Sequence, residues 1–157
     1  NLFRRYTINM NIKKLESTQA REITDLVWDV MIHAKQLPNK VANSSEFYMI
    51  LYNLITKGIK DESLLCYGML DNDKLIGMIG YEIETNQIIY LYVLPEYQKQ
   101  GIGSKLLDII INGVNQDESI MVRAHRDAVA MYEKYGFEKD NSDTKWAIGM
   151  TYTIRRK

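Results

Sequence analysis

Two glycines separated by one residue, Gly101 and Gly103, are the residues of this sequence whose type and spacing point most directly to chemistry. They stand between an apolar, strand-like run that ends at Pro95 and a run with helical periodicity. The first backbone N–H groups of a helix lack partners within the helix, and glycines let a ligand approach them without meeting a Cβ atom. Lys99 and Lys105 place positive charge nearby. The pattern therefore predicts a site for an anionic group such as a phosphate.

Two common nucleotide-binding motifs do not account for these glycines. A dinucleotide fingerprint, Gly-x-Gly-x-x-Gly, requires a glycine where this chain has Leu106, and it also requires a βαβ unit. A P-loop requires Gly-Lys followed by Ser or Thr after four intervening residues, and this segment lacks that pattern. The expected anion therefore belongs to another kind of ligand.

Two amphipathic helices are predicted ahead of this segment, and each stripe marks the face expected to pack on the rest of the domain. The first helix follows Ser17 and Thr18, which can cap it, and is ended by Pro38; its stripe contains Ile23, Leu26, Val27, Val30, Met31 and Ala34. The second begins near Asn43 and is capped near Gly58; its stripe contains Phe47, Ile50, Leu51, Leu54 and Ile55.

Short β-rich runs joined by polar turns make up most of the remaining chain, and they favour an antiparallel meander. Strands are expected over residues 8–15, 64–70, 75–83, 87–94, 119–124 and 145–154. Two further helices are expected over residues 103–114 and 128–135. The order β-α-α-β-β-β-α-β-α-β predicts an α+β domain with a mixed, mostly antiparallel central sheet flanked by helices.

The composition fits one soluble domain, because 46% of the 157 residues are hydrophobic and 25% are charged. We place this domain at residues 10–157 and interpret residues 1–9 as a leader or an expression remnant. Lys plus Arg equals Asp plus Glu, at 20 each, so the basic excess typical of nucleic-acid-binding proteins is missing. A single cysteine, Cys66, and the lack of a bilayer-spanning apolar run indicate a reducing, cytoplasmic compartment.

The segment from Gln98 to Gly103 resembles motif A of the GNAT superfamily of N-acetyltransferases, Gln/Arg-x-x-Gly-x-Gly/Ala. Residues 127–137, with Tyr132 four positions before Gly136, resemble motif B of the same family. The element order agrees with the family over about residues 10–154. The resemblance implies a GNAT-like acyl-CoA transferase fold. It also implies an N-acetyltransferase that moves an acetyl group from acetyl-CoA to a primary amine of a small molecule or peptide, by direct attack in a ternary complex.

The resemblance also implies where acetyl-CoA binds. Its pyrophosphate is expected on the backbone N–H groups of residues 100–104, and its pantetheine arm along the strand that ends near Tyr92 and Val93. The implied cofactor-binding residues are Tyr92, Val93, Gln98, Lys99, Gln100, Gly101, Ile102, Gly103, Ser104 and His125. His125 departs from the family pattern, which usually has an asparagine at this position.

Acyl transfer needs a neutral amine, stabilisation of the carbonyl oxygen and a proton for the departing thiolate. By the resemblance, Tyr132 is the general acid and the backbone N–H of Val93 meets the oxyanion. Many family members carry a glutamate in the strand before motif A, where this chain has Ile89. Glu82 or Glu84, on the neighbouring strand or its turn, is left as a candidate base that acts through water.

His33, off the apolar stripe of the first helix, is a candidate substrate-binding residue or base, since this region lines the acceptor pocket in the family. With two histidines and one cysteine, none at ligand spacing, no metal is expected. Neither a nucleic acid nor a membrane is expected as a partner, and a homodimer stays open. Because Ile89 replaces the glutamate that many family members have in this strand, a non-catalytic acyl-CoA-binding regulatory module is the alternative function.

Overall fold

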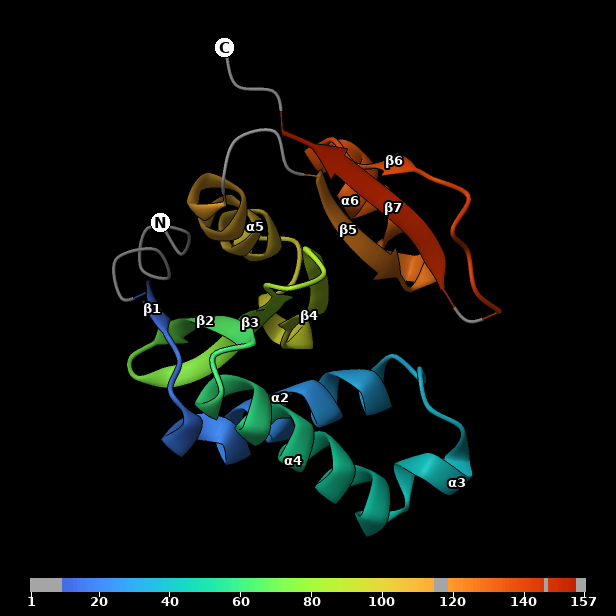
Figure 1. The fold of residues 1–157 in the computed structure, drawn as a ribbon. Helices are drawn as coiled ribbons and strands as arrows, with labels where there is room; N and C mark the ends of the chain where they lie inside the picture. The colour runs from blue at the N-terminus through green and yellow to red at the C-terminus, as the bar shows by residue number, and fades with distance from the viewer. Residues whose placement is uncertain (1–9, 115–118, 146, 155–157) are drawn as a thin grey trace.

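A seven-stranded sheet runs through the part of the chain that the computed structural model describes, residues 10–114, 119–145 and 147–154. Its strand order is β1-β2-β3-β4-β5-β7-β6 (Figure 1). Neighbouring strands are antiparallel except β4 and β5, which are parallel. The strands are β1 (Met10–Lys14), β2 (Leu64–Asp71), β3 (Lys74–Glu82), β4 (Gln87–Val93), β5 (Ser119–Ala124), β6 (Glu138–Lys139) and β7 (Ile148–Thr153).

Helices cover both faces of the sheet, so that each face has its own apolar core (Figure 1). One face carries α2 (Ala20–His33) and α4 (Ser45–Lys60), which are connected through α3 (Asn39–Ala42). The other face carries α5 (Ile102–Gly113) and α6 (Val129–Tyr135). Three short 3-10 helices complete the described elements: η1 (Ser17–Gln19), η2 (Pro95–Tyr97) and η3 (Arg126–Ala128).

The predicted fold class and the antiparallel meander are confirmed, since β2, β3 and β4 pair in sequence order. The prediction lacks α3 and β6, because elements of four and two residues are too short to show a periodic pattern. The interpretation of residues 1–9 as a leader, and the part of the first predicted strand before Met10, lie outside the described residues. None of the described helices combines the length and apolar character that a membrane span requires.

Helix α2 buries the predicted face but begins later than expected. Its buried residues include Ile23, Leu26, Val27 and Val30. Ser17 and Thr18 do not cap it, because they form η1 instead. Glu16 and Gln19 close that turn with reciprocal side-chain to backbone hydrogen bonds, which is the capping-box arrangement. The helix therefore starts at Ala20, where the chain leaves the 3-10 turn.

Helix α4 contradicts the predicted burial of its apolar stripe. Ile55 is its one buried residue, whereas Phe47, Ile50 and Leu54 are 47%, 53% and 59% exposed. The helix begins at Ser45, and Gly58 lies inside it, where an added Cβ atom would come within 2.8 Å of Leu64 Cβ. The prediction was wrong because helical periodicity shows which face is apolar, and not whether another element covers that face.

Adjacent residues of α4 give a direct test of this arrangement. Ile55→Ala should lower the free energy of unfolding by about 2–5 kcal/mol, because it empties space in a fully buried position. Leu54→Ala, one residue earlier, should change it by less than about 0.5 kcal/mol, since the side chain is mostly in solvent. Urea unfolding followed by circular dichroism measures both values. Equal losses in the two variants would mean that α4 packs in another orientation.

Candidate active site

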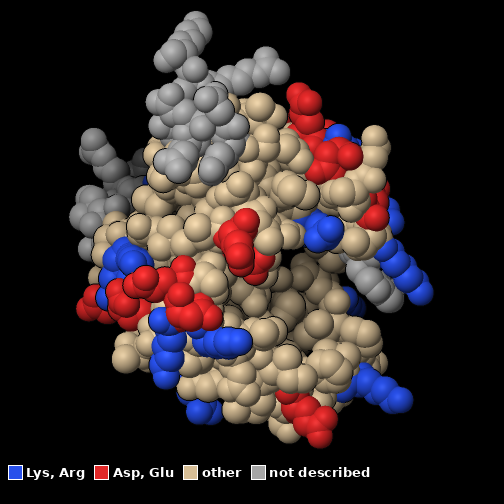
Figure 2. Space-filling model, viewed as in Figure 1, with Lys and Arg blue, Asp and Glu red and all other residues tan. Residues whose placement is uncertain are grey.

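Strands β4 and β5 separate shortly after they meet, and this separation opens the site. They pair at two positions, Gln87 with Met121 and Ile88 with Val122. Beyond these pairs the strands diverge around a cavity of about 410 Å³. The cavity is lined from β4, the loop after it, the start of α5, the end of β5, α6 and the end of α2. Figure 2 shows this face hollowed, with mainly uncharged residues around the hollow.

A β-bulge in β4 decides which side chains face the cavity. Gly80 pairs with Tyr90 and Tyr81 pairs with Ile88, so Ile89 is an extra residue on β4. Because of the bulge, Ile88 packs in the core under α5, while Tyr90 and Tyr92 pack against the core under α2 and α4. Ile89 itself lines the cavity. An apolar side chain therefore stands where many relatives were expected to have a glutamate.

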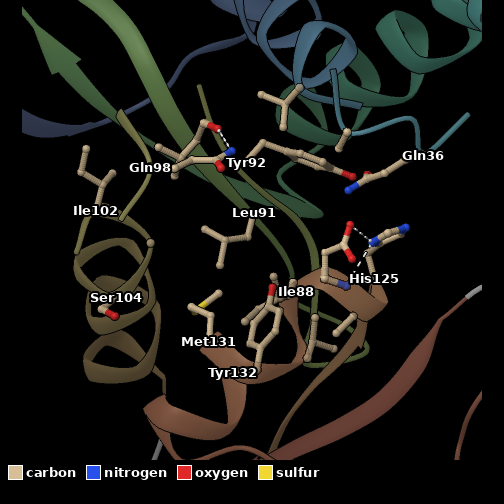
Figure 3. A pocket seen from close by; sticks show the side chains of 18 of the residues that line it. Gln36, Ile88, Leu91, Tyr92, Gln98, Ile102, Ser104, His125, Met131 and Tyr132 are labelled. Carbon is tan, nitrogen blue, oxygen red and sulfur yellow. Dashed lines mark hydrogen bonds and ion pairs between the residues drawn. The ribbon is translucent and has the colours of Figure 1, made fainter. Parts of the chain in front are cut away.

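The backbone of Val93 faces the open side of β4. The N–H of the next residue, Leu94, donates to the carbonyl oxygen of Ile76 at 2.9 Å, which directs it toward β3. Successive N–H groups of a strand point to opposite edges, so the Val93 N–H points toward the gap between β4 and β5. The Val93 carbonyl shares that edge and accepts a hydrogen bond from Gln98 Nε2 at 2.9 Å (Figure 3). The strand edge thus presents an N–H group to the cavity.

The two glycines form the start of α5, as the expected anion site requires. Gly101 is the N-cap residue with a φ of 79°, a left-handed conformation that favours glycine. An added Cβ atom at Gly101 would have no atom within 4 Å, so the space beside this turn is open. The Lys105 N–H is bonded to the Gly101 carbonyl, at 3.1 Å. The N–H groups of residues 102–104 precede it in the first turn and have no partner within the helix.

Nearly all of the residues implied to bind the cofactor lie together on this cavity. The lining includes Tyr92, Val93, Gln98, Lys99, Gly101, Ile102, Gly103, Ser104 and His125. Gln100 is an exposed residue of the loop before α5 and is not part of the lining. The cavity is therefore continuous from the start of α5 to the end of β5.

Tyr132 projects from α6 toward Ile88 and Leu91 in the middle of the cavity (Figure 3). It is 4% exposed, and its ring packs edge-on against Phe137 with centroids 5.2 Å apart. Its hydroxyl has no hydrogen-bond partner among the described residues. Every fully enclosed polar side-chain atom of these residues has a partner, so the Tyr132 hydroxyl is not fully enclosed. The oxygen must therefore reach the cavity space. Burial raises the pKa of Tyr132, and the nearby Tyr92 adds to the shift, so the phenol stays protonated.

Gln36, just after the end of α2, also lines the cavity. No motif or periodic pattern in the sequence predicts this position. Lys35 takes a left-handed φ of 54°, and the Gln36 N–H donates to the Met31 carbonyl at 2.9 Å. This helix-terminating arrangement, rather than Pro38, ends α2 at His33. The Gln36 side chain then points toward the Tyr92 hydroxyl and toward His125 (Figure 3).

The other candidate residues lie elsewhere. Glu82 ends β3 and accepts a hydrogen bond from the Thr85 hydroxyl at 2.7 Å, and Glu84 lies in the turn that follows. Neither glutamate lines the cavity, and neither does His33, which is exposed at the end of α2. Among the residues that the structure describes, no group of three or more His, Cys, Asp and Glu side chains could hold a metal ion.

Cys66 lies in the core under α2 and α4 and is 1% exposed. Burial raises its pKa to about 12, so the thiol stays protonated. We expect the folded protein to react with a chromogenic disulfide reagent roughly 100-fold more slowly than the unfolded protein, because reaction requires exposure and ionisation. Absorbance during labelling with and without denaturant measures the two rates. Equal rates would show that Cys66 is accessible in the native state.

Comparison with known proteins identifies the family. The model of the acetyltransferase (GNAT) domain family matches residues 31–153. The fold is similar to that of the PaiA N-acetyltransferase from Thermoplasma acidophilum in complex with coenzyme A, at 23% identity and a TM-score of 0.74, over 92% of this chain and 99% of that chain. A predicted acetyltransferase from Clostridium acetobutylicum with acetyl-CoA gives 18% identity and a TM-score of 0.71, over 87% of this chain and 94% of that chain.

A third similar structure is a variant of the SpeG spermidine N-acetyltransferase from Vibrio cholerae, with 19% identity and a TM-score of 0.63, over 93% of this chain and 94% of that chain. No curated protein sequence matches significantly. The structural likenesses show the fold, and the domain match covers more than half of the sequence. The chain therefore belongs to the GNAT acetyltransferase family and is an acyltransferase.

Proposed function

We propose that this protein transfers an acetyl group from acetyl-CoA to a primary amine of a small molecule or peptide, by direct attack in a ternary complex. The observation that carries the proposal is one cavity that joins a helix N-terminus, an open strand edge and a phenol. The N–H groups at the start of α5 and the Val93 N–H lie along the cavity, and the Tyr132 hydroxyl reaches into it.

The start of α5 suits the pyrophosphate of the co-substrate. Gly101 leaves open space where a side chain would otherwise intrude, and Lys99 on the same loop supplies positive charge. Each charge-assisted hydrogen bond to a phosphate contributes about 1.5–3 kcal/mol, so a few of them can hold the group on a protein with zero net charge. The edge of β4 at Tyr92 and Val93 suits the pantetheine arm, which would pair with it as an extended strand does.

The chemical roles follow from the same groups. When bound, acetyl-CoA supplies the activated acyl group as a thioester. The Val93 N–H stabilises negative charge on the carbonyl oxygen of that thioester. Tyr132 donates its proton to the departing sulfur and recovers one from the attacking nitrogen, so that the phenol ends in its starting state. Glu82 and Glu84 stay candidates for the base, acting through water because neither lines the cavity.

The decisive experiment is an amine panel. The assay follows the release of free thiol from acetyl-CoA in the presence of amino acids, short peptides, aminoglycosides or polyamines. Spermidine is included because the similar Vibrio cholerae structure is named a spermidine N-acetyltransferase. Turnover with any amine, dependent on both substrates, supports acetyl transfer. Normal coenzyme A binding by calorimetry with no turnover on any amine would overturn it in favour of the CoA-binding regulatory module.

A further inference from the structure

The proposed reaction needs a group that takes a proton from the acceptor ammonium, and few described cavity residues have that chemistry. The lining side chains that can ionise are Tyr92, Tyr97, Lys99, Arg123, His125, Asp127 and Tyr132. The Tyr97 hydroxyl donates a hydrogen bond to Asp71 Oδ2 at 2.7 Å. Lysine and arginine are protonated at neutral pH. Tyr132, which is buried, and Tyr92, which is partly buried, keep their protons because desolvation raises the pKa of each. Histidine is the side chain that ordinarily exchanges a proton near pH 7. His125 is thus the chemically suitable group on this wall.

His125 is also held in a defined position. It follows β5 and caps η3, where its Nδ1 accepts a hydrogen bond from the Asp127 N–H at 3.3 Å. The Asp127 carboxylate oxygen Oδ2 lies 3.5 Å from the same nitrogen. When Nδ1 accepts from the Asp127 N–H, a neutral imidazole carries its proton on Nε2. When the proton is on Nδ1 instead, it faces the Asp127 carboxylate, and Nε2 is free to accept a proton from a substrate. The side chain is 37% exposed, so an acceptor from solvent can reach it.

The surroundings of His125 suit an amine. Tyr92 from β4 and Gln36 from the end of α2 point toward this end of the cavity (Figure 3). Both offer uncharged hydrogen-bonding groups. The nearest charged groups along the chain are Arg123 at the end of β5, which also lines the cavity, and Arg126 and Asp127 on η3. His33 and Lys35 are exposed at the end of α2. The pyrophosphate site at the start of α5 lies at the opposite end of the lining.

We infer that His125 is the catalytic base and that Asp127 positions it. This inference rests on the proposed function and assigns the base that the sequence left open. With its own proton on Nδ1, toward the Asp127 carboxylate, the neutral His125 takes a proton from the acceptor ammonium on Nε2. The freed amine forms the C–N bond as the C–S bond breaks. The second nitrogen proton passes to sulfur by way of Tyr132, and the imidazolium returns its proton to solvent. The Asp127 carboxylate stabilises the imidazolium through Nδ1.

The test uses His125→Asn, which can still cap η3 but cannot act as a base near neutral pH. We expect kcat/KM for the amine to fall about 100-fold and its acidic limb to disappear. Coenzyme A affinity should stay within a few-fold of wild type, because asparagine is the residue that the family pattern usually has at this position and it keeps an amide to contact the cofactor. His125→Gln serves as a second variant, and Arg126→Gln, an exposed neighbour off the cavity, is the matched control. Asp127→Asn should lower kcat for the amine more than it changes KM, because Nδ1 loses the carboxylate that positions the imidazole.

Three outcomes overturn the inference. One is an unchanged acidic limb in both His125 variants while the wild type turns over, which leaves the proposed function intact. Another is a loss of coenzyme A affinity that accounts for the whole effect, which makes His125 a residue that contacts the pantetheine arm. The third is no turnover of any amine by the wild type, which removes the proposed function as well.

Nuclear magnetic resonance of the imidazole protons gives a readout independent of turnover. The chain has two histidines, so the His125 variants assign both signals. A reactive amine added to the protein with coenzyme A should shift the His125 signal and leave that of His33 in place. The reverse pattern would favour His33 and contradict the inference.

Discussion

Replacing Tyr132 by phenylalanine should lower kcat about 100-fold and leave coenzyme A affinity within a few-fold of wild type, because the change removes only the proton donor. The hydroxyl has no partner among the described residues, and the ring keeps its edge-on contact with Phe137. The free energy of unfolding should therefore change little. Steady-state kinetics with a reactive amine, together with calorimetry for coenzyme A, measure the two effects separately.

Tyr135→Phe is the matched control, one turn further along the same helix. Its hydroxyl donates to Asp108 Oδ1 at 2.6 Å, and it does not line the cavity. This variant should keep kcat and lose about 1 kcal/mol of stability at most. A Tyr132→Phe enzyme with normal kcat would remove the phenol from the mechanism and leave it a packing residue.

The pH dependence of kcat should reflect the protonation state of Tyr132. Burial raises the pKa of Tyr132 above the usual phenol value of about 10. The phenol therefore stays protonated and competent as a donor to at least about pH 9. No fall in kcat from its ionisation is expected below that pH. A basic limb near neutral pH that disappears in Tyr132→Phe would contradict this assignment.

Gly101→Val should weaken coenzyme A binding by at least about 100-fold, the largest binding effect expected from a single substitution. The φ of 79° at Gly101 is strained for any residue with a Cβ atom and most of all for a β-branched one. The new side chain would enter the open space beside the first turn of α5. Losing two charge-assisted hydrogen bonds there costs about 3 kcal/mol or more, which corresponds to the expected loss of affinity.

Isothermal titration calorimetry with coenzyme A measures the change, and Gly113→Ala provides the control. Gly113 lies at the other end of α5 with open space around it and no positive φ, so its substitution should leave binding unchanged. Gly101→Asn separates strain from obstruction, since asparagine tolerates the left-handed region better than valine. Normal coenzyme A binding by Gly101→Val would show that the pyrophosphate lies elsewhere.

Several features of this protein could be predicted from sequence because they depend on residues close together in the chain. The start of α5 at Gly101 and Gly103 is one, since a left-handed glycine before a helical stripe acts within a single turn. The meander of β2, β3 and β4 is another, because short polar turns join neighbouring strands. The match to the family also follows from local motifs, and the fold confirms the order of elements between them.

Which side chains face the site was decided by the tertiary structure. The bulge at Ile89 turns Tyr90 and Tyr92 toward the α2 and α4 face, and it depends on the register between β3 and β4. Gln36 faces Tyr92 and His125 only because the sheet order brings the end of α2 beside β4 and β5. The apolar stripe of α4 is exposed for the same reason, since the arrangement of the other elements leaves that face of the helix uncovered. Periodicity and motifs indicate which element a residue belongs to and what chemistry its side chain offers. The neighbours of that side chain depend on long-range packing, which local patterns in a single sequence do not reveal.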